Sequence, residues 1–195
     1  MTKLLLISGS LRRNSFNTRL LQHVSRHLQE HCTVEFLDPS QVLLPLFDQD
    51  LELEPAVIKQ VADLHVRITR SDGLIISSPE YNGQLTPYLK NLVDWVSRMG
   101  YIDASFGSAF CDRPVLLCSA STGWSGGSGA IPSARALFGY VGSLVIGDTV
   151  CVPYAHQGWT DETGFLFDQP FEDRISAACQ RLLTLANAFS ECPIT

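Results

Sequence analysis

Residues 73–95 read GLIISSPEYNGQLTPYLKNLVDW, and this stretch decides the fold. It begins with a short, nearly continuous apolar run over residues 73–77, as expected of a strand that helices cover on both faces. Further on, Thr86 can cap a helix, Pro87 fits the first helical position, and apolar residues then recur every three or four positions. A buried strand therefore leads through a polar loop into a helix, which is the unit from which parallel α/β sheets are built.

The rest of the chain repeats this alternation of strand and helix without an internal repeat, a linker or a low-complexity segment, so we expect a single domain over residues 1–195. The runs 3–8, 114–120 and 143–152 are nearly continuously apolar, whereas TVEFLD (33–38) alternates and is typical of a sheet edge. The helices that we expect are 16–30, 55–70, 86–99, 131–141 and 170–189.

Two strand orders, 2-1-3-4-5 and 3-2-1-4-5, are common for five strands that are each followed by a helix. The alternating segment is second along the chain and predicted to lie at the edge, which favours 2-1-3-4-5 with helices on both faces of the sheet. Ligands of such open sheets bind outside the carboxyl ends of the strands at the switch point, here between the first and third strands. The loops that follow the first, third and fourth strands are therefore the place to look for chemistry.

Composition limits the classes of partner. With 14 Lys and Arg against 20 Asp and Glu, the net charge is −6, and no basic block favours nucleic acid or an anionic membrane. No apolar run has the length of a signal peptide or a membrane span, so we expect a soluble cytoplasmic protein that acts on a small molecule. Six cysteines lie far apart without a CxxC pair, which predicts buried free thiols: Cys32, Cys111, Cys118, Cys151, Cys179 and Cys192.

The first strand runs into GSLRRNSFN (9–17), which has the composition of an anion site. A helix N-terminus offers free N–H groups and the positive end of its dipole, and an arginine adds charge-assisted hydrogen bonds. The stretch contains neither GxxxxGK[ST] nor GxGxxG, so a monophosphate fits better than a nucleotide triphosphate or a dinucleotide. Plain helix capping and solvated charge are the alternative interpretation of the same residues.

The third and fourth strands also end in polar, glycine-containing loops, SPEYNG (78–83) and SASTGWSGGSGA (119–130). Both loops can present N–H groups and flat side chains to a planar heterocycle, and the glycines would let the backbone approach its ring closely. Each loop alone can be explained as a turn with capping residues. Three such loops at neighbouring strand ends favour a binding site.

GSLRRNSFN together with SPEYNG and LKNLVDW resembles the NAD(P)H-dependent FMN reductases of flavodoxin-like fold, which include quinone, chromate and azo-dye reductases. The resemblance implies a three-layer sandwich, FMN as cofactor, and NADPH or NADH as co-substrate. By the same resemblance, the FMN phosphate is held by Ser10, Arg12, Ser15 and Asn17. The flavin ring and ribityl chain are lined by Pro79, Glu80, Tyr81 and Asn82, and the third loop contributes Ser121, Thr122, Gly123, Gly126 and Gly127.

Glu80 has two possible roles, general base or binding residue. We assign it to binding, and assign no catalytic side chain, because flavin N5 accepts a hydride directly. Tyr81 either borders the ring face where nicotinamide and acceptor stack in turn or packs against the adjacent loop. The sequence departs from the family pattern at Gln84–Tyr88, where Pro-Gly is usual, at Trp124, and over 151–169, which does not align; these departures concern the substrate-facing surface.

His23, His27 and His31 recur every four residues, a spacing that can bind a metal, but no carboxylate or cysteine partner is evident, so we expect no metal. The resemblance also implies a homodimer or homotetramer with the flavin near the interface. Aromatic residues beside the core stripe are the candidates for that interface, although singly exposed aromatics are also ordinary: Tyr88, Trp95, Trp124 and Trp159.

The predicted function is hydride transfer from a nicotinamide through bound FMN to a quinone-like or other small acceptor, or to free flavin. One alternative is a flavodoxin-type electron carrier, which shares fold and cofactor but normally lacks an arginine such as Arg12 in the phosphate loop. Another is a binding or regulatory module that has lost the flavin. A phosphatase or nucleotide hydrolase is disfavoured because no strand end carries a carboxylate-rich metal site.

Overall fold

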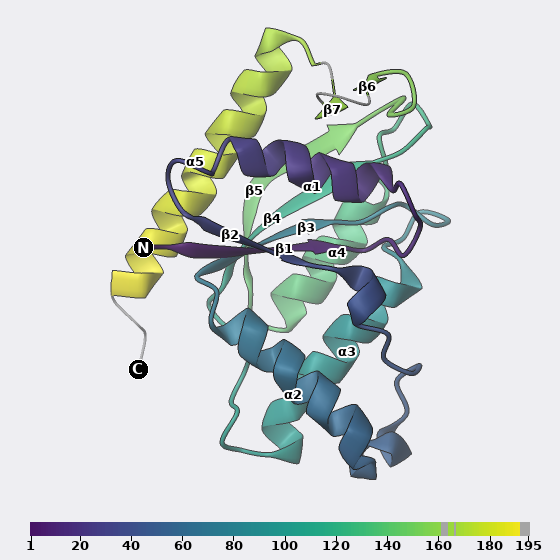
Figure 1. Ribbon diagram of the computed structural model, residues 1–195, viewed down its shortest axis with the longest axis vertical. Coiled ribbons are helices and arrows are strands. Elements are labelled where there is room, and N and C mark those ends of the chain that lie inside the picture. The colour runs from purple at the N-terminus through teal and green to yellow at the C-terminus, as the bar shows by residue number, and fades with distance from the viewer. Residues whose placement is uncertain (161–163, 166, 192–195) are drawn as a thin grey trace.

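A computed structural model, which describes residues 1–160, 164, 165 and 167–191, contains a five-stranded parallel sheet between two layers of helices (Figure 1). Its strand order is β2-β1-β3-β4-β5, which confirms the predicted order and the edge position of the second strand. The ladder runs without a break in register from β2 to β4, with one irregularity between β4 and β5. The strands are β1 (Lys3–Ser8), β2 (Thr33–Leu37), β3 (Gly73–Ser77), β4 (Pro114–Ala120) and β5 (Leu144–Val152).

The helices are α1 (Phe16–Arg26), α2 (Pro55–Thr69), α3 (Pro87–Ile102), α4 (Ala130–Tyr140) and α5 (Gln169–Glu191). Helices α1 and α5 cover one face of the sheet, and α2, α3 and α4 cover the other. Three smaller features were not predicted: the 3-10 helices Pro39–Gln41 and Gln49–Leu53, and the hairpin of β6 (Trp159–Thr160) and β7 (Gly164–Phe165).

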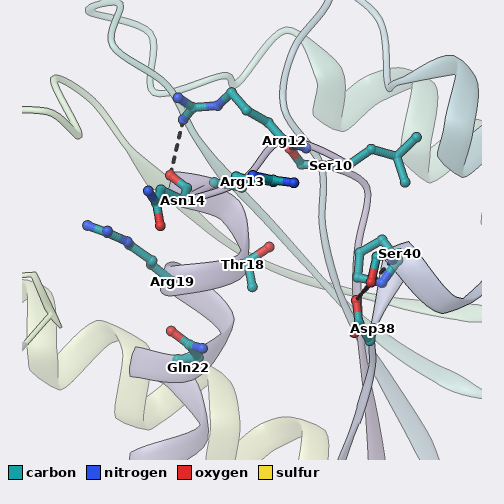
Figure 2. Close-up of a pocket in the computed structure, with 12 residues that line it drawn as sticks. Ser10, Arg12, Arg13, Asn14, Thr18, Arg19, Gln22, Asp38 and Ser40 are labelled. Carbon is teal, nitrogen blue, oxygen red and sulfur yellow. Dashed lines mark hydrogen bonds between the residues drawn. The ribbon is translucent and has the colours of Figure 1, made fainter.

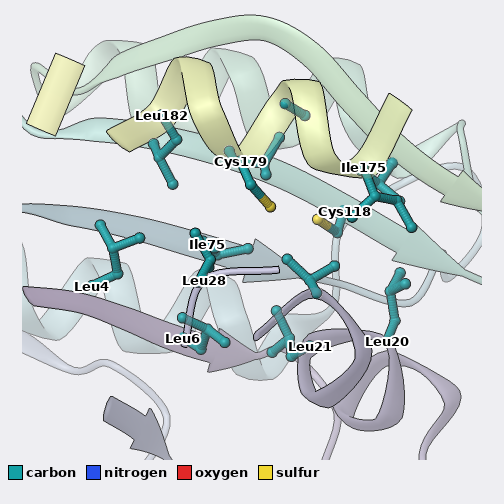
Figure 3. Packing of buried hydrophobic residues seen from close by; sticks show 14 of the residues in the cluster. Leu4, Leu6, Leu20, Leu21, Leu28, Ile75, Cys118, Ile175, Cys179 and Leu182 are labelled. Carbon is teal, nitrogen blue, oxygen red and sulfur yellow. The ribbon is translucent and has the colours of Figure 1, made fainter. Parts of the chain in front are cut away.

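Successive residues of a strand point to opposite faces, and helices cover both faces of the three central strands β1, β3 and β4, so the residues in the middle of these strands must be apolar. Leu4 and Leu6 of β1 therefore pack with α1 and α5 (Figure 3), while Leu5 and Ile7 pack with the opposite layer. All four are at most 1% exposed. This burial explains why the strands could be recognised from apolar runs alone.

Helix α3 begins as predicted, because the Thr86 hydroxyl accepts a hydrogen bond from the Leu89 N–H at 3.3 Å and Pro87 takes the first position. The prediction that Trp95 lies beside the core was wrong. Its side chain is completely buried, its ring packs edge-to-face on Phe47 with centroids 4.9 Å apart, and its indole N–H donates to the Pro45 carbonyl at 2.8 Å. The segment between β2 and α2, whose 3-10 helices were not predicted, supplies these contacts.

Among the other interface candidates, Tyr88 is half-buried and packs against the core between the sheet and α3, whereas Trp124 is 80% exposed. The side chain of Trp159 lies outside the described part of the chain. The described cysteines are free thiols, as predicted, but Cys111 is exposed rather than buried because it follows a turn before β4. Cys192 lies outside the described residues.

Candidate functional site

Three loops meet at the carboxyl ends of β1, β3 and β4: residues 9–15, 78–86 and 121–129, named here the first, second and third loop. Hydrogen bonds tie them to one another. The Gly9 N–H donates to the Ser77 carbonyl at 2.8 Å, and the Thr86 hydroxyl donates to the Gly9 carbonyl at 2.6 Å. The Ser119 hydroxyl donates to the Ser78 carbonyl at 2.7 Å. The polar strand ends that were predicted to converge therefore do lie together, at the switch point between β1 and β3.

Asn17 is the central residue of this linkage, and the structure shows a second role for it beside the predicted one. Its side-chain amide donates to the Ala120 carbonyl at 2.9 Å and accepts from the Ala120 N–H at 3.0 Å and the Ser77 hydroxyl at 2.8 Å. The residue is only 2% exposed. Since these bonds engage a buried amide, Asn17 joins the ends of β3 and β4 to α1, and its predicted contact with a phosphate stays a prediction.

The first loop forms one wall of an open pocket of about 330 Å³ (Figure 2). Ser15 caps α1, since its hydroxyl accepts from the Asn17 N–H at 3.2 Å, and the Ser10 hydroxyl accepts from the Arg12 N–H at 3.3 Å. Among the described residues neither hydroxyl proton has an acceptor, so both can donate to an anion. The pocket is rich in positive charge, because its lining includes Arg12, Arg13 and Arg19.

Arg12 is one of two exposed arginines that line this pocket, together with Arg13. Its guanidinium donates to the Asn14 carbonyl at 3.4 Å (Figure 2) and lies 5.2 Å from the centre of the Phe16 ring. The hydrogen bond is long and the ring contact is weak at an exposed site, so both leave the side chain able to turn toward a bound anion. Asn14 itself has φ 56°, which bends the chain sharply before the helix.

The second loop contains a tight turn that was not predicted from the sequence. Asn82 and Gly83 have φ values of 53° and 75°, and the main chains of Tyr81 and Gln84 exchange hydrogen bonds of 2.9 and 3.1 Å. Two central residues with positive φ are the signature of an Asn-Gly turn of type I′, and that dipeptide could have revealed it. The positive φ therefore explains why an asparagine occupies position 82, whether or not its side chain also binds a ligand. Tyr81 stands on this turn with 51% of its surface exposed.

Glu80 closes the second loop onto the third. Its carboxylate accepts from the Gly129 N–H at 2.9 Å, at the point where α4 begins. A negative charge is stabilised there by the helix dipole. The carboxylate is thus engaged within the protein, and the predicted contact of this residue with a flavin ring stays a prediction.

The glycines of the third loop are needed for a different reason from the one predicted. Gly126 and Gly127 have φ values of 63° and 80°. A Cβ at Gly126 would lie 2.8 Å from the backbone between β5 and Pro153, and one at Gly127 would lie 2.0 Å from the Ser119 hydroxyl oxygen. These two glycines allow the loop to pack on its own sheet, whereas a Cβ at Gly123 would meet nothing closer than 3.6 Å.

The remaining predicted residues border the same region. Pro79 and Ser121 are half-buried, and Thr122 is exposed. The Ser121 hydroxyl accepts from the Gly123 N–H at 3.2 Å, which shapes the start of the third loop. Together the loops offer an anion site at the start of α1 and two short, rigid segments of main chain beside it. That arrangement suits a ligand with a phosphate at one end and a flat polar ring at the other.

Comparison with known proteins agrees with this geometry. Residues 2–157 match the sequence profile of a family described as NADPH-dependent FMN reductase. A quinone reductase of Escherichia coli (strain K12) is 29% identical over 169 residues, which span 86% of either chain. A quinone reductase of Pseudomonas putida is 31% identical over 186 residues, covering 88% of this chain and 91% of its own. Among solved structures, the flavoenzyme NAD(P)H:(acceptor) oxidoreductase FerB from Paracoccus denitrificans superposes with a TM-score of 0.82 over 96% of this chain and 98% of its own, at 18% identity.

Proposed function

Because the chain belongs to the NADPH-dependent FMN reductase family, we propose that its three loops hold FMN and that the acceptor of the reaction is a quinone. The class of activity follows from the family and the relatives: the protein is an NAD(P)H-dependent flavin oxidoreductase, with FMN as cofactor and NAD(P)H as co-substrate. What we add is the assignment of residues and of the acceptor.

The phosphate of FMN lies at the start of α1 in this proposal. The observation that carries the assignment is the pocket beside the first loop, where a capped helix N-terminus meets an arginine-rich wall. The hydroxyls of Ser10 and Ser15 donate to phosphate oxygens, and Arg12 turns from the Asn14 carbonyl to a charge-assisted contact. Asn17 acts behind them by holding the loops in register.

The ring of FMN lies against the second and third loops. Bound FMN supplies the redox chemistry, because its N5 accepts a hydride without help from a titrating side chain. Main-chain groups of residues 79–82 and 121–127 bind the polar edge of the ring, and the Glu80–Gly129 hydrogen bond keeps the two loops at a fixed separation. Tyr81 and Trp124 are exposed beside this region, so they border the open face where nicotinamide and acceptor bind in turn.

A quinone is the favoured acceptor because relatives from two bacterial genera that match most of this chain are named quinone reductases, and because a flat ring suits an aromatic border. The test is an anaerobic reaction of FMN-loaded protein with NADPH or NADH, followed by a panel of quinones, chromate, azo dyes and free flavin. We expect rapid reduction by a nicotinamide, rapid reoxidation by a quinone, and parallel double-reciprocal plots, since both substrates use one face. Negligible turnover of NAD(P)H would leave the electron carrier as the better description, and a colourless protein that refuses added FMN would favour the binding module.

The assembly is proposed to be a homodimer or homotetramer in the cytoplasm. Exposed aromatic residues such as Trp124 and Tyr140 support self-association, since both are at least 80% exposed in the single chain. None of the helices in the described part of the chain has the length and apolarity to cross a membrane. Light scattering coupled to gel filtration measures the assembly, and a monomer at micromolar concentration would contradict the proposal.

A further inference from the structure

A cluster of two histidines and one glutamate joins α1 to α5, and none of its members belongs to the three loops. His23 lies in α1 and His27 follows at its carboxyl end, so the two rings share one face of the helix. Glu172, in the first turn of α5, reaches both of them. The sequence could not reveal this partner, because 145 residues separate it from His27.

The two imidazoles aim the same nitrogen at the same carboxylate. Nε2 of His23 lies 2.9 and 3.1 Å from the two carboxylate oxygens of Glu172, and Nε2 of His27 lies 2.9 Å from one of them. All three ligand atoms are within 4.8 Å of one another. The His23 side chain is 8% exposed, while His27 and Glu172 retain 23% and 24%, so a small ion can enter from solvent.

We propose that His23, His27 and Glu172 form a binding site for a zinc ion. Two imidazole nitrogens and one carboxylate oxygen are a ligand set that Zn²⁺ accepts, with water in the fourth position. With metal–ligand distances of about 2.0–2.2 Å, tetrahedral geometry separates neighbouring ligand atoms by roughly 3.3–3.5 Å. Each histidine–glutamate pair, now 2.9 Å apart, needs to open by only a few tenths of an ångström, and the two imidazole nitrogens, which lie within 4.8 Å of each other, need to come to about 3.3 Å.

The environment of His23 sets the strength of this site. Zn²⁺ at Nε2 requires the neutral ring to carry its proton on Nδ1, and Nδ1 of His23 is buried without a hydrogen-bond partner among the described residues. Loss of support for a ligating histidine typically weakens metal binding about 10- to 100-fold. We therefore expect weaker Zn²⁺ binding than at a site where both histidines donate Nδ1–H to a partner. The ion would link α1 to α5. The first loop lies at the opposite end of α1.

The test uses untagged, FMN-loaded protein that has been treated with chelator and then dialysed. Isothermal titration with ZnCl₂ should give one ion per chain, and Co²⁺ should produce the visible absorption of a tetrahedral site. His27→Gln and Glu172→Gln should each weaken Zn²⁺ binding at least about 10-fold. His31→Gln is the matched control, because His31 continues the same spacing but is exposed beyond the end of α1 and outside the cluster.

Thermal melting separates loss of the site from loss of the fold. A hundredfold excess of Zn²⁺ over its dissociation constant should raise the melting temperature by about 5–10 °C in the wild type and in His31→Gln, but not in His27→Gln. Melting of all variants in EDTA establishes that each one is folded. Absence of stoichiometric binding in the wild type, or full binding retained by both His27→Gln and Glu172→Gln, would overturn the proposal. Neither result bears on the flavin site.

Discussion

Replacing Asn17 by alanine tests whether this residue organises the loops or binds the phosphate. The change removes three hydrogen bonds of 2.8–3.0 Å and leaves the Ser77 hydroxyl and both main-chain groups of Ala120 without their partner. Ser77 and Ala120 are at most 3% exposed, so water does not readily replace the amide. A buried group without a partner costs about 1–3 kcal/mol, and taking the lower end for each of the three groups gives a total of about 3 kcal/mol.

The first measurement is thermal unfolding of the flavin-free protein. For a domain of this size, 1 kcal/mol corresponds to about 2–4 °C, so Asn17→Ala should melt about 6–12 °C below the wild type. If that variant does not fold, Asn17→Asp is the alternative, since its carboxylate keeps both accepted bonds; it loses the one donated to Ala120 and sets an oxygen against that carbonyl, so it should melt below the wild type as well.

The second measurement is the affinity of the protein for FMN and for riboflavin, which is determined from the quenching of flavin fluorescence. An organising role predicts that both flavins bind more weakly by the same factor, because the loops lose their register. A phosphate contact predicts weaker binding of FMN only. Wild-type melting combined with loss of FMN affinity and unchanged riboflavin affinity would refute our interpretation and restore the phosphate role first predicted for Asn17.

Three further predictions concern the site and its surroundings. Arg12→Ala should weaken FMN binding about 10- to 150-fold and leave riboflavin unaffected, because a hydrogen bond to a charged group contributes about 1.5–3 kcal/mol; equal loss of both flavins would contradict this. Gly127→Val should lower both flavin content and melting temperature, since even its Cβ would overlap a neighbouring hydroxyl, whereas Gly123→Ala should change neither; equal behaviour of the two variants would be the contrary result. Burial raises the pKa of Tyr88 to about 12 and its hydroxyl has no hydrogen-bond partner among the described residues, so Tyr88→Phe should be at least as stable as the wild type in urea at pH 8. The unfolded tyrosine ionises near pH 10 while the folded one stays neutral, so wild-type stability should fall between pH 10 and 12 more steeply than that of Tyr88→Phe; parallel pH profiles would refute the linkage.

The sheet could be predicted from the sequence because its burial leaves a simple signal. Three strands, Lys3–Ser8, Gly73–Ser77 and Pro114–Ala120, match the predicted limits at both ends, since polar residues begin where the covering helices end. The start of α3 was equally clear from its cap and proline. Helix α1 ends four residues early, at Arg26, because the chain turns there toward β2, and no glycine or proline marks the turn.

The tertiary partners of single residues could not be predicted, because they come from distant parts of the chain. Trp95 looked exposed beside the stripe of α3, yet the segment after β2 covers it. The histidines of α1 looked isolated until α5 brought Glu172 beside them. Sequence patterns show which face of a helix is apolar, but they do not show which irregular segment covers the flank of that face.

The polar residues at the strand ends show why a family motif does not assign atoms. Asn17, Glu80 and Ser119 all belong to stretches that resemble flavin loops, yet their side chains bond to other parts of the protein. The groups of the loops that stay free for a ligand are mainly backbone N–H and C=O groups. The side-chain hydrogen bonds just named hold this backbone in place. Backbone N–H groups fixed by buried side chains cannot turn toward water when the ligand leaves, so the site needs little reorganisation to bind it again. It follows that substitutions of these inward-facing residues should alter the affinity for every flavin alike, whereas only the hydroxyls and arginines of the first loop should distinguish FMN from riboflavin.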